Sequence, residues 1–392
     1  MNAHNYNYVE SVGILEDSKK YTEKEHLVSQ KILCKDYNDA VILPPKADYA
    51  GKRNGNWGKG GVVDSEGNFI VASTYVGDWA TQGGFYEYNH VDKIIDDDVV
   101  YIGFISGHYG HFLVDCTTKL WPLVNMKKLG KNVKVAYTGD NELNGNAKMI
   151  INLLGINDED LLYIDEVTKF RKVYVPEQSA KPGEWYTREY LKVFETIQEN
   201  IKQRAEVHSE IKRKVYFTRT GYLDAKKKEV GEKTLEKVFA YNNFEIYNPE
   251  RLSIVDMMEI INESTEVACI NGTIPLNMIF SYNKNVKLIV LNKTGVYHRN
   301  LEYFAEICNF RIIYVDVYDK KFKAKDLGVG PFIVTVTDNL RNYFLDNGMK
   351  IPNETKTFKY KDYCTFLILL ANRSVRDKLR PVKNKLKEIL HK

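Results

Sequence analysis

VACINGTIPLNMIFSYNKNVKLIVL, residues 267–291, is the stretch that decides the fold. It begins with the apolar run Val267–Ile270 and turns through a glycine. It then continues through Ile274–Tyr282, with a proline near its start, and ends in the apolar run Lys287–Leu291. Proline is favoured in the first turn of a helix, where its missing N–H costs nothing. Strand, short turn, helix and strand in this order predict a parallel βαβ unit.

The same alternation extends on both sides of this stretch. Apolar runs predict further strands at 214–218, 244–247 and 311–315, and helical periodicity predicts helices at 232–242, 253–263 and 300–309. Repeated units of this kind form a doubly wound sheet, whose ligands bind at the carboxyl ends of the strands.

A second alternating series occupies the first half of the chain. Its predicted elements are a strand at 99–105, a helix at 110–129, a strand at 133–138, a helix at 144–154 and a strand at 161–164. Ahead of it, Gly60–Val71 has two apolar runs around a Ser-Glu-Gly-Asn turn, which is typical of a β-hairpin. The expected fold class is therefore α/β, with two Rossmann-like lobes facing a cleft, a β-rich N-terminal region and C-terminal helices.

A charged helix predicted at residues 187–211 separates the two series. Its apolar residues recur at helical spacing: Tyr190, Leu191, Phe194, Ile197 and Ile201. With 392 residues, of which 44% are hydrophobic, the chain is long enough for two cores. The predicted division is an N-terminal lobe at 1–186, a bridging helix at 187–211, a C-terminal lobe at 212–318, and helices with a basic tail at 319–392.

The formal net charge of +4 is unevenly placed. Residues 373–392 contain eight Lys or Arg and two acidic residues, so the tail carries +6 and the rest of the chain −2. A slightly acidic body lacks the basic face that binds nucleic acid. The sequence therefore argues against a nucleic-acid partner.

The tail has the pattern of a basic amphipathic helix, interrupted by Pro381. Its apolar residues lie three or four apart between basic ones: Val375, Leu379, Val382, Leu386 and Leu390. Such a helix either attaches to an anionic membrane surface or is an ordinary solvated terminal helix. The preceding apolar run, Phe366–Ala371, is predicted to be a buried helix segment.

Cysteine usage and the N-terminus bear on the compartment. The cysteines are odd in number, scattered and without a CxxC pair: Cys34, Cys116, Cys269, Cys308 and Cys364. This pattern indicates a reducing compartment. The first residues lack the pattern of a signal peptide, and no later run reaches the roughly 18 apolar residues of a membrane span. We expect a cytoplasmic protein, with the basic tail as its candidate contact with the inner face of the cell membrane.

The densest group of reactive side chains is Gly107-His108-Tyr109-Gly110-His111-Phe112-Leu113-Val114-Asp115, directly after the predicted strand at 99–105. His111 and Asp115 are four residues apart, so they share one face near a helix N-terminus and are candidates for an acid/base pair. Alternatively, His111 packs against Trp121 and Asp115 satisfies backbone groups or a nearby cation.

A basic group follows another predicted strand. Arg219 leaves the strand at 214–218, and Lys226, Lys227 and Lys228 come before the next helix. A guanidinium, ammonium groups and helix N–H groups together could hold a diphosphate. The alternative is a solvated basic loop.

The third group is Cys269-Ile270-Asn271-Gly272-Thr273-Ile274-Pro275-Leu276-Asn277. A loop of small residues at a helix start is a cradle for phosphate or carbonyl oxygen, and alone it is a weak signal. It occupies the same edge of the same predicted sheet as Arg219, so the two groups are expected to converge on one ligand.

The sequence offers no metal or P-loop motif in the right place. Asp96-Asp97-Asp98 matches an Asp-x-Asp string but precedes a predicted strand instead of following one, so it is interpreted as a polar turn. The glycine-rich stretch at 51–61 lacks the Ser or Thr that follows Gly-Lys in a P-loop. No His/Cys spacing fits zinc, and no metal or cofactor is expected.

These three groups, in this order, resemble glycosyltransferase family 61 (DUF563-type), whose bacterial members are often linked to capsular or other surface polysaccharides. The resemblance covers roughly residues 60–295. Gly110–Asp115 with Leu120–Leu123 is similar to the family's GHF…LWP segment, and further similar positions are Arg219, Glu232, Leu235, Asn248–Ser253, Asn271–Thr273 and Asn277. The chain departs from the family in having Asn271 in place of a frequent His and Met257 in place of a frequent Gln.

The resemblance implies a GT-B-like, metal-independent, inverting hexosyl- or pentosyltransferase that uses a nucleotide sugar, most often UDP-linked. Either Asp115 or His111 would be the base, and His108 and Tyr109 would lie on the acceptor side. The implied donor-binding residues are Arg219, Lys228, Glu250, Asn271, Gly272, Thr273 and Asn277. The acceptor would be a glycan or lipid-linked glycan precursor of the cell surface.

Two other functions fit the same residues. One is a catalytically silent homologue that binds a glycan or a partner transferase, which the departure at Asn271 keeps open. The other is a hydrolase of nucleotide sugars, with water as the acceptor.

Overall fold

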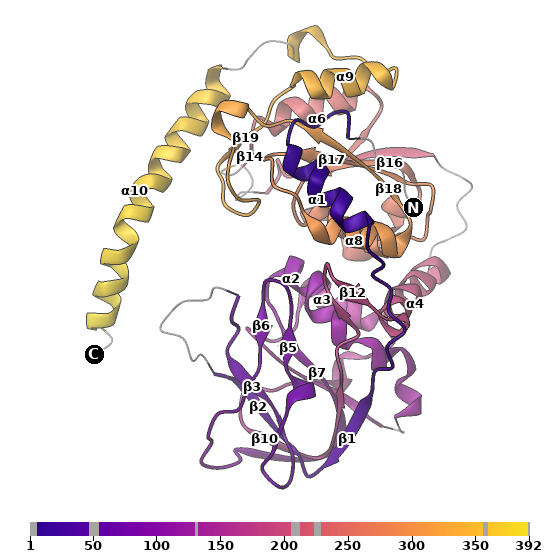
Figure 1. Cartoon of the computed structure of the whole chain (residues 1–392), viewed down its shortest axis with the longest axis vertical. Helices are drawn as coiled ribbons and strands as arrows, with labels where there is room; N and C mark the ends of the chain where they lie inside the picture. Colours follow the sequence, from indigo (N-terminus) through magenta and orange to yellow (C-terminus); the bar gives the residue numbers. More distant parts are fainter. Residues whose placement is uncertain are drawn as a thin grey trace.

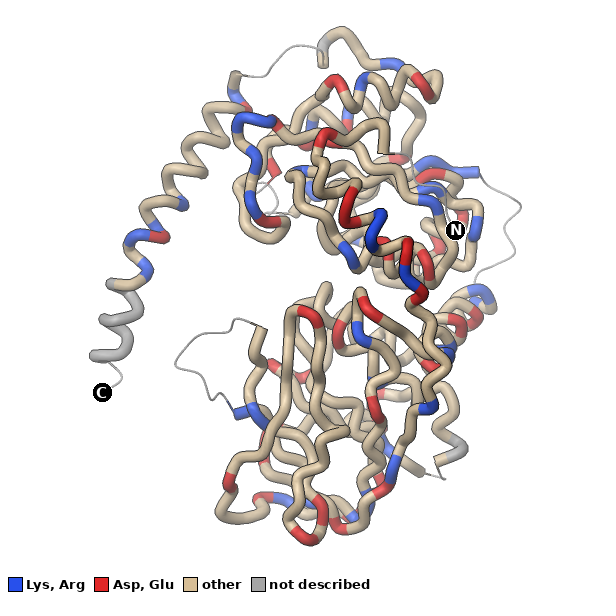
Figure 2. Tube along the Cα trace, in the orientation of Figure 1, with Lys and Arg blue, Asp and Glu red and all other residues tan. Residues whose placement is uncertain are grey.

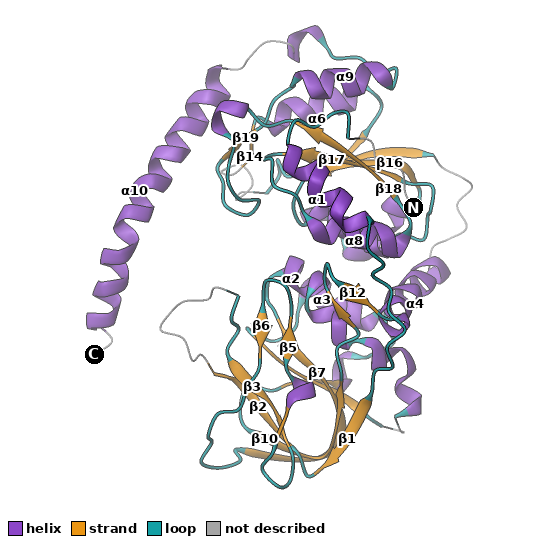
Figure 3. Ribbon diagram, viewed as in Figure 1, coloured by secondary structure: helices purple, strands orange, loops and turns teal. Residues whose placement is uncertain are grey.

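Two larger β-sheets, each parallel at its centre, organise this mixed α/β chain (Figure 1, Figure 3). The computed structural model describes residues 6–46, 55–129, 132–204, 212–222, 229–355 and 360–390. In Figure 3 the first sheet is bordered mainly by loops and short helices, whereas helices flank the second sheet.

The first sheet has the strand order β4-β3-β2-β10-β7-β8-β9, with β1 also paired to β10. β10, β7, β8 and β9 run parallel, and the other pairs are antiparallel. The strands are β1 (Cys34–Asn38), β2 (Val41–Lys46), β3 (Lys59–Val63), β4 (Phe69–Ile70), β7 (Lys93–Ile105), β8 (Lys134–Gly139), β9 (Leu161–Tyr163) and β10 (Thr168–Pro176). β3 and β4 confirm the predicted hairpin, and β8, β9 and helix α3 (Gly145–Asn152) confirm the predicted alternation.

The long helix predicted at 110–129 is wrong. The chain forms a short helix α2 (Tyr109–Val114) and two 3₁₀ helices, η2 (Cys116–Lys119) and η3 (Trp121–Lys128). The hydroxyls of Thr117 and Thr118 donate to the carbonyls of Leu113 and Asp115, at 2.9 Å each. Threonine hydroxyls that bond back to main-chain carbonyls compete with the helix, and Pro122 removes an N–H. The catalytic candidates therefore lie on one and a half turns of helix.

The acidic run Asp96-Asp97-Asp98 lies inside β7, so its interpretation as a turn is wrong. Cations on the two neighbouring strands explain why a strand tolerates it. Asp97 pairs with Lys134 of β8, and Asp98 pairs with Arg171 of β10, at 2.8 Å each. Opposite charges across neighbouring strands stabilise the sheet and give these carboxylates structural partners.

The second sheet is wholly parallel, with the order β15-β13-β16-β17-β18. Its strands are β13 (Arg213–Phe217), β15 (Glu245–Tyr247), β16 (Ser264–Ile270), β17 (Lys287–Asn292) and β18 (Arg311–Asp316); the intervening helices are α6 (Glu232–Tyr241), α7 (Ile254–Asn262), η6 (Ile274–Phe280) and α8 (Arg299–Cys308). The predicted series is confirmed, except that Ile274–Phe280 is a 3₁₀ helix. From β13 the chain adds β15 on one side, and then returns to add β16, β17 and β18 on the other side. The strand order therefore reverses between β13 and β16, and this is the switch point where ligands bind in doubly wound folds.

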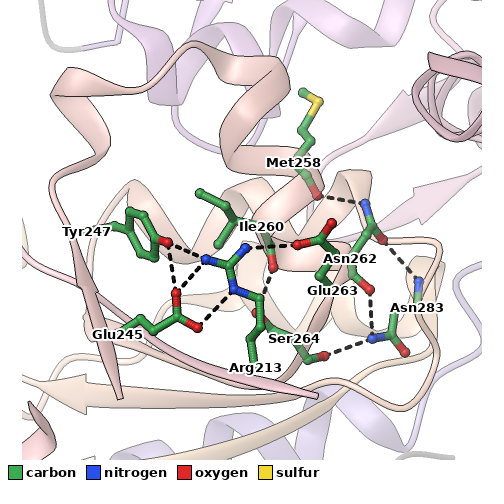
Figure 4. A network of polar contacts seen from close by, with 9 residues as sticks. All are labelled: Arg213, Glu245, Tyr247, Met258, Ile260, Asn262, Glu263, Ser264 and Asn283. Carbon is green, nitrogen blue, oxygen red and sulfur yellow. Dashed lines mark hydrogen bonds and ion pairs between the residues drawn. The ribbon is translucent and has the colours of Figure 1, made fainter. Parts of the chain in front are cut away.

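The amino end of this sheet is fastened by a polar network around Arg213 (Figure 4). Its guanidinium donates to Glu245 at 3.0 Å, to Glu263 at 2.8 Å, and to the hydroxyl of Tyr247. Nearby, the side-chain amide of Asn283 donates to the main-chain carbonyls of Asn262 at the end of α7 and Ser264 at the start of β16. This network lies at the opposite end of β13 from Arg219, so it serves the fold.

The N-terminal region is not wholly β-rich as predicted, because Val12–Thr22 forms helix α1. Its buried residues Ile14, Ser18 and Tyr21 recur at helical spacing, and α1 packs against α8. The preceding backbone is tied to β18, since Asp316 N–H donates to Tyr8 O at 2.9 Å. The first described residues thus pack with the second sheet.

The remaining elements connect the two sheets and complete the chain. The predicted bridging helix is α4 (Arg188–Arg204), with Tyr190, Phe194, Ile197 and Ile201 buried. The short elements are η1 (Val71–Ser73), β5 (Tyr75–Val76), β6 (Thr81–Gln82), η4 (Asp158–Asp160), β11 (Ala180–Lys181), β12 (Trp185–Tyr186), β14 (Glu229–Val230), η5 (Pro249–Arg251), η7 (Lys320–Phe322), β19 (Phe332–Ile333), α9 (Asp338–Asp346) and η8 (Asn353–Thr355).

Helix α10 (Tyr360–Leu390) extends away from the rest of the chain and is continuous through Pro381 (Figure 1). Phe366 is buried against Val230 and Ile333, but Leu367 is 40% and Ile368 61% exposed. The prediction of a buried segment at 366–371 is therefore wrong for most of its residues; only Phe366 is buried, and Leu369 packs partly buried against the same cluster. Lys and Arg recur along the helix (Figure 2). Among the described helices, none has both the length and the apolar character that a bilayer span requires.

Candidate functional site

Helix α2 begins where β7 ends and holds His111 and Asp115 together. Nδ1 of His111 lies 2.8 Å from Oδ2 of Asp115, as the four-residue spacing predicts. Asp115 is only 5% exposed, and its other oxygen, Oδ1, accepts from the hydroxyl of Tyr75 at 2.5 Å. Both carboxylate oxygens therefore have partners inside the protein.

The imidazole of His111 is the accessible member of this pair, with 30% of its side chain exposed. Because Nδ1 faces the carboxylate, a neutral ring carries its proton on Nδ1 and its lone pair on Nε2. Its ring neighbours are His108, Trp57 and Trp79. Trp121, the partner considered in the alternative interpretation, instead donates its indole N–H to Glu177 O at 2.9 Å.

The start of α2 meets the loop after β16. The Tyr109 hydroxyl donates to Oδ1 of Asn277 at 2.6 Å, and burial raises the pKa of that hydroxyl well above its usual value. A β-carbon on Gly110 would lie 3.1 Å from Oγ1 of Thr273, so the two segments approach closely at this glycine. Residues predicted for the acceptor side and the donor side are thus in direct contact.

Arg219 lies just beyond β13, within a buried group of charges. Its backbone N–H donates to Oε1 of Glu232 at 3.0 Å, and its Nε lies 3.6 Å from Oε2 of Glu229. The other oxygen of Glu229 is 2.7 Å from Nζ of Lys293, and a β-carbon on Gly272 would lie 3.9 Å from that nitrogen. Arg219 and the loop after β16 therefore border the same Glu229–Lys293 pair, as their positions on the sheet predict.

Glu229 and Lys293 are site candidates that sequence reasoning missed. Lys293 directly follows β17, and this position at the carboxyl edge of the sheet was the available signal. Burial lowers the pKa of Lys293, while Glu229 opposes the shift. Lys228, predicted for the donor site, and its neighbours Lys226 and Lys227 lie outside the described residues.

Asn271 and Glu250 occupy different surroundings. Asn271 is 1% exposed, and its Nδ2 donates to Oδ1 of Asn292 at 3.1 Å; Asn292 in turn donates to Asp316 at 3.0 Å. This amide ladder spans the carboxyl ends of β16, β17 and β18. Glu250 is exposed on η5, and a β-carbon on Gly221 would lie 2.5 Å from its Oε1. Glu250 thus lies beside the loop that carries Arg219.

A cavity of about 160 Å³ adjoins Arg219 at the start of α6. It is lined by Thr220, Glu229, Val230, Gly231, Glu232, Lys233, Asp362 and Thr365. Gly231 caps the helix at φ +99°, and a β-carbon there would lie 2.1 Å from Val334 O, so the turn requires glycine. Another cavity, of about 210 Å³, lies at the carboxyl ends of β7 and β8 and includes Tyr109 in its lining.

Burial raises the pKa of Glu232 to about 7, although the Arg219 backbone N–H opposes the shift. Because the folded pKa exceeds the unfolded one, Glu232 costs no stability below the unfolded value of 4.5. The penalty grows as pH rises between the two values and is complete above about pH 7, where it is on the order of 3 kcal/mol.

Glu232→Gln is therefore expected to stabilise the fold at alkaline pH. The free energy of unfolding from urea titrations should rise by about 3 kcal/mol near pH 8 and change little near pH 4. The exposed Glu250→Gln serves as the control and should show no such pH-dependent difference. A constant effect of Glu232→Gln at both pH values would contradict a titrating Glu232.

Among the residues that the structure describes, no three His, Cys, Asp or Glu side chains are grouped to hold a metal ion. The basic side chains that the structure places around the buried group of charges are Arg219, the exposed Lys233 and Lys293, which is buried and paired with Glu229. The chemistry that the site offers is thus a histidine–carboxylate pair on a helix that contacts the second sheet, and basic side chains at the switch point of that sheet.

Residues 109–289 match the model of a protein family, Glycosyltransferase 61. No curated protein matches the chain. The matched segment starts at α2 and reaches into β17, so it includes the His111–Asp115 pair, Arg219 and the loop after β16. Over this segment the chain is similar to glycosyltransferase family 61, and this similarity supports glycosyl transfer as its chemistry.

Proposed function

We propose that the chain is an inverting, metal-independent glycosyltransferase that moves a sugar from a nucleoside diphosphate to a glycan hydroxyl. The observation that carries the proposal is the contact of α2 with Thr273 and Asn277, in the loop and helix that follow β16. It brings the helix that carries the histidine–carboxylate pair against the second sheet, and the pair, Arg219 and the loop after β16 all lie within the segment that matches the family. Inverting transfer needs both: a base for the acceptor and charge stabilisation for the leaving group.

His111 is the general base in this proposal. Its Nε2 takes the proton of the acceptor hydroxyl as that oxygen attacks the anomeric carbon from the side opposite the diphosphate. Asp115 holds Nδ1–H and stabilises the imidazolium that forms, while Tyr75 keeps the carboxylate in place. Asp115 suits this positioning role better than the role of base, because it is buried and both its oxygens already accept hydrogen bonds.

The leaving diphosphate is assigned to the second sheet. Arg219 would contact a phosphate with its guanidinium, and the backbone at Gly272 and Thr273 would add N–H groups. Lys293 supplies positive charge beneath them, paired with Glu229. Glu250 lies beside the loop that carries Arg219. Lys228 follows Arg219 in the sequence, before α6. In this GT-B-like arrangement the first sheet serves the acceptor and the second serves the donor, for which we propose a UDP-sugar.

We propose a cell-surface glycan precursor as acceptor and the inner face of a bacterial membrane as the place of reaction. Helix α10 supports this placement, because Val375 and Leu379 are each 57% exposed among basic residues. Such a face suits an anionic lipid surface. Sedimentation of the full chain with vesicles of anionic or neutral lipid tests the placement; equal binding to both would contradict it.

Thermal unfolding with UDP, GDP, CMP or dTDP, with and without EDTA, tests the donor site. A ligand at 100 times its Kd adds about 2.7 kcal/mol to stability, which raises the Tm of a chain this long by about 3 °C. We expect one nucleotide to give this shift and EDTA to leave it intact. A shift that EDTA removes would contradict metal independence. No shift with any nucleotide would favour the catalytically silent homologue, which the departure at Asn271 keeps as the second candidate.

A further inference from the structure

The hairpin of β5 and β6 presents an aromatic surface next to His111. Trp79, in its turn, is 58% exposed, and its ring lies nearly parallel to the imidazole, with centroids 4.6 Å apart and planes 13° apart. Trp57 meets the same imidazole edge-on at 5.6 Å, and its backbone N–H donates to Thr81 O of the hairpin at 2.9 Å. One indole thus lies on the ring of the proposed base with much of its surface open to solvent.

A buried amide accompanies this surface. Gln82 is 3% exposed, yet neither its Oε1 nor its Nε2 has a hydrogen-bond partner in the described part of the chain. Gln82 pairs directly with Tyr75 across the hairpin, so the two side chains lie on the same face. Tyr75 reaches Asp115 from that face. An unpaired buried amide is costly, and the hydroxyl of a ligand that reached it would supply the missing partner.

The hairpin is held from both sides. Asp78, next to Trp79, forms an ion pair with Arg299 of α8, and Gln178 bonds both the N–H and the carbonyl of Val76, at 2.8 and 3.2 Å. The turn that carries Trp79 is therefore anchored both to α8 and to the segment that contains Gln178. A surface fixed in advance loses less entropy when a ligand binds.

We propose that Trp79, Trp57 and Gln82 form an acceptor subsite that takes a pyranose ring. A pyranose has an apolar C–H face, which suits an exposed indole, and a rim of hydroxyls, which suits an unpaired amide. The bound ring would lie beside His111, whose imidazole stacks on the same indole. The assignment rests on the proposed function, because it makes His111 the base for the bound hydroxyl, and it extends that function by naming the acceptor class and its contacts.

Fluorine NMR of the full chain labelled with 5-fluorotryptophan tests the subsite. The chain has four tryptophans: Trp57, Trp79, Trp121 and Trp185. The fluorine resonance of each is assigned with the corresponding Trp→Phe variant. The probes are methyl pyranosides of glucose, galactose, mannose and N-acetylglucosamine. We expect at least one of them to shift the Trp79 and Trp57 resonances saturably and to leave those of Trp121 and Trp185 unmoved.

Variants separate the contributions within the subsite. Gln82→Leu should weaken the probe's affinity roughly three- to tenfold, and Trp79→Ala about tenfold or more. The control is Tyr241→Ala on α6, because Tyr241 is an equally exposed aromatic residue at 58%; this variant should bind as the wild type does. If Gln82→Leu left the affinity for the pyranoside unchanged, the Gln82 amide would not contact the sugar, and this part of the proposal would be wrong.

The outcomes keep the two proposals apart. If a nucleotide raises the Tm but no pyranoside shifts Trp79, the acceptor subsite is wrong and the glycosyltransferase proposal stands. If a pyranoside shifts Trp79 but no nucleotide sugar is turned over, the subsite stands and the transfer proposal is wrong. Shifts confined to Trp121 or Trp185 would also overturn the subsite.

Discussion

Replacement of His111 by alanine is expected to lower kcat for sugar transfer by about 10²- to 10⁴-fold, the usual contribution of a general base. Nucleotide binding should be unchanged, because Arg219 and its neighbours lie on the other sheet. Asp115→Asn should cost a comparable factor. An amide N–H facing Nδ1 favours the tautomer with its proton on Nε2, and that nitrogen then cannot accept the hydroxyl proton. Initial rates of nucleotide release at saturating donor measure both effects.

The matched control for this prediction is His90, which also pairs with an aspartate. Its Nε2 lies 2.7 Å from Oδ1 of Asp92, but its side chain is 74% exposed. His90→Ala should transfer sugar at the wild-type rate. If His111→Ala kept most of the activity, the assignment of the base would be wrong, however well the donor still bound.

Arg219→Gln should remove half or more of the nucleotide-induced Tm shift while leaving the ligand-free Tm nearly unchanged. A charge-assisted hydrogen bond to phosphate contributes about 1.5–3 kcal/mol, so affinity should fall roughly 10- to 100-fold. Glu229 keeps Lys293 as a partner in this variant, which limits the structural cost. Thermal melts with a nucleotide titration give both quantities from one set of samples.

Arg213→Gln is the control, because Arg213 begins β13 and Arg219 follows its end. Arg213 pairs with Glu245 and Glu263, so its loss should cost about 1–3 kcal/mol of stability after allowance for solvent screening. The nucleotide shift should survive in this variant. The reverse outcome, with the shift lost in Arg213→Gln and kept in Arg219→Gln, would mean that the donor binds at the amino end of the sheet and not at its carboxyl end.

The second sheet could be predicted because its information is local. Each strand, turn and helix of residues 213–316 has its own apolar run or period, and parallel topology then brings Arg219 and Gly272 to one edge. The spacing of His111 and Asp115 likewise predicts their contact, since four residues complete about one helical turn. These parts of the site follow from short-range patterns.

The parts that escaped prediction depend on contacts distant in sequence. β7 includes three aspartates because cations arrive from β8 and β10, which no local pattern reveals. The predicted helix at 110–129 breaks where threonine hydroxyls and a proline compete with its hydrogen bonds. Tyr75 reaches Asp115 and Trp79 reaches His111 only because a hairpin folds back on α2. A site assembled from three regions of the chain was therefore recognised in two.

Inverting transfer can be observed by proton NMR of the anomeric signals during incubation of the protein with its nucleotide sugar and a pyranoside acceptor. We expect a product of inverted anomeric configuration, nucleotide release that depends on the acceptor, and loss of both in His111→Ala. Retention of configuration, or equal release of nucleotide without an acceptor, as a nucleotide-sugar hydrolase would give, would contradict inverting transfer.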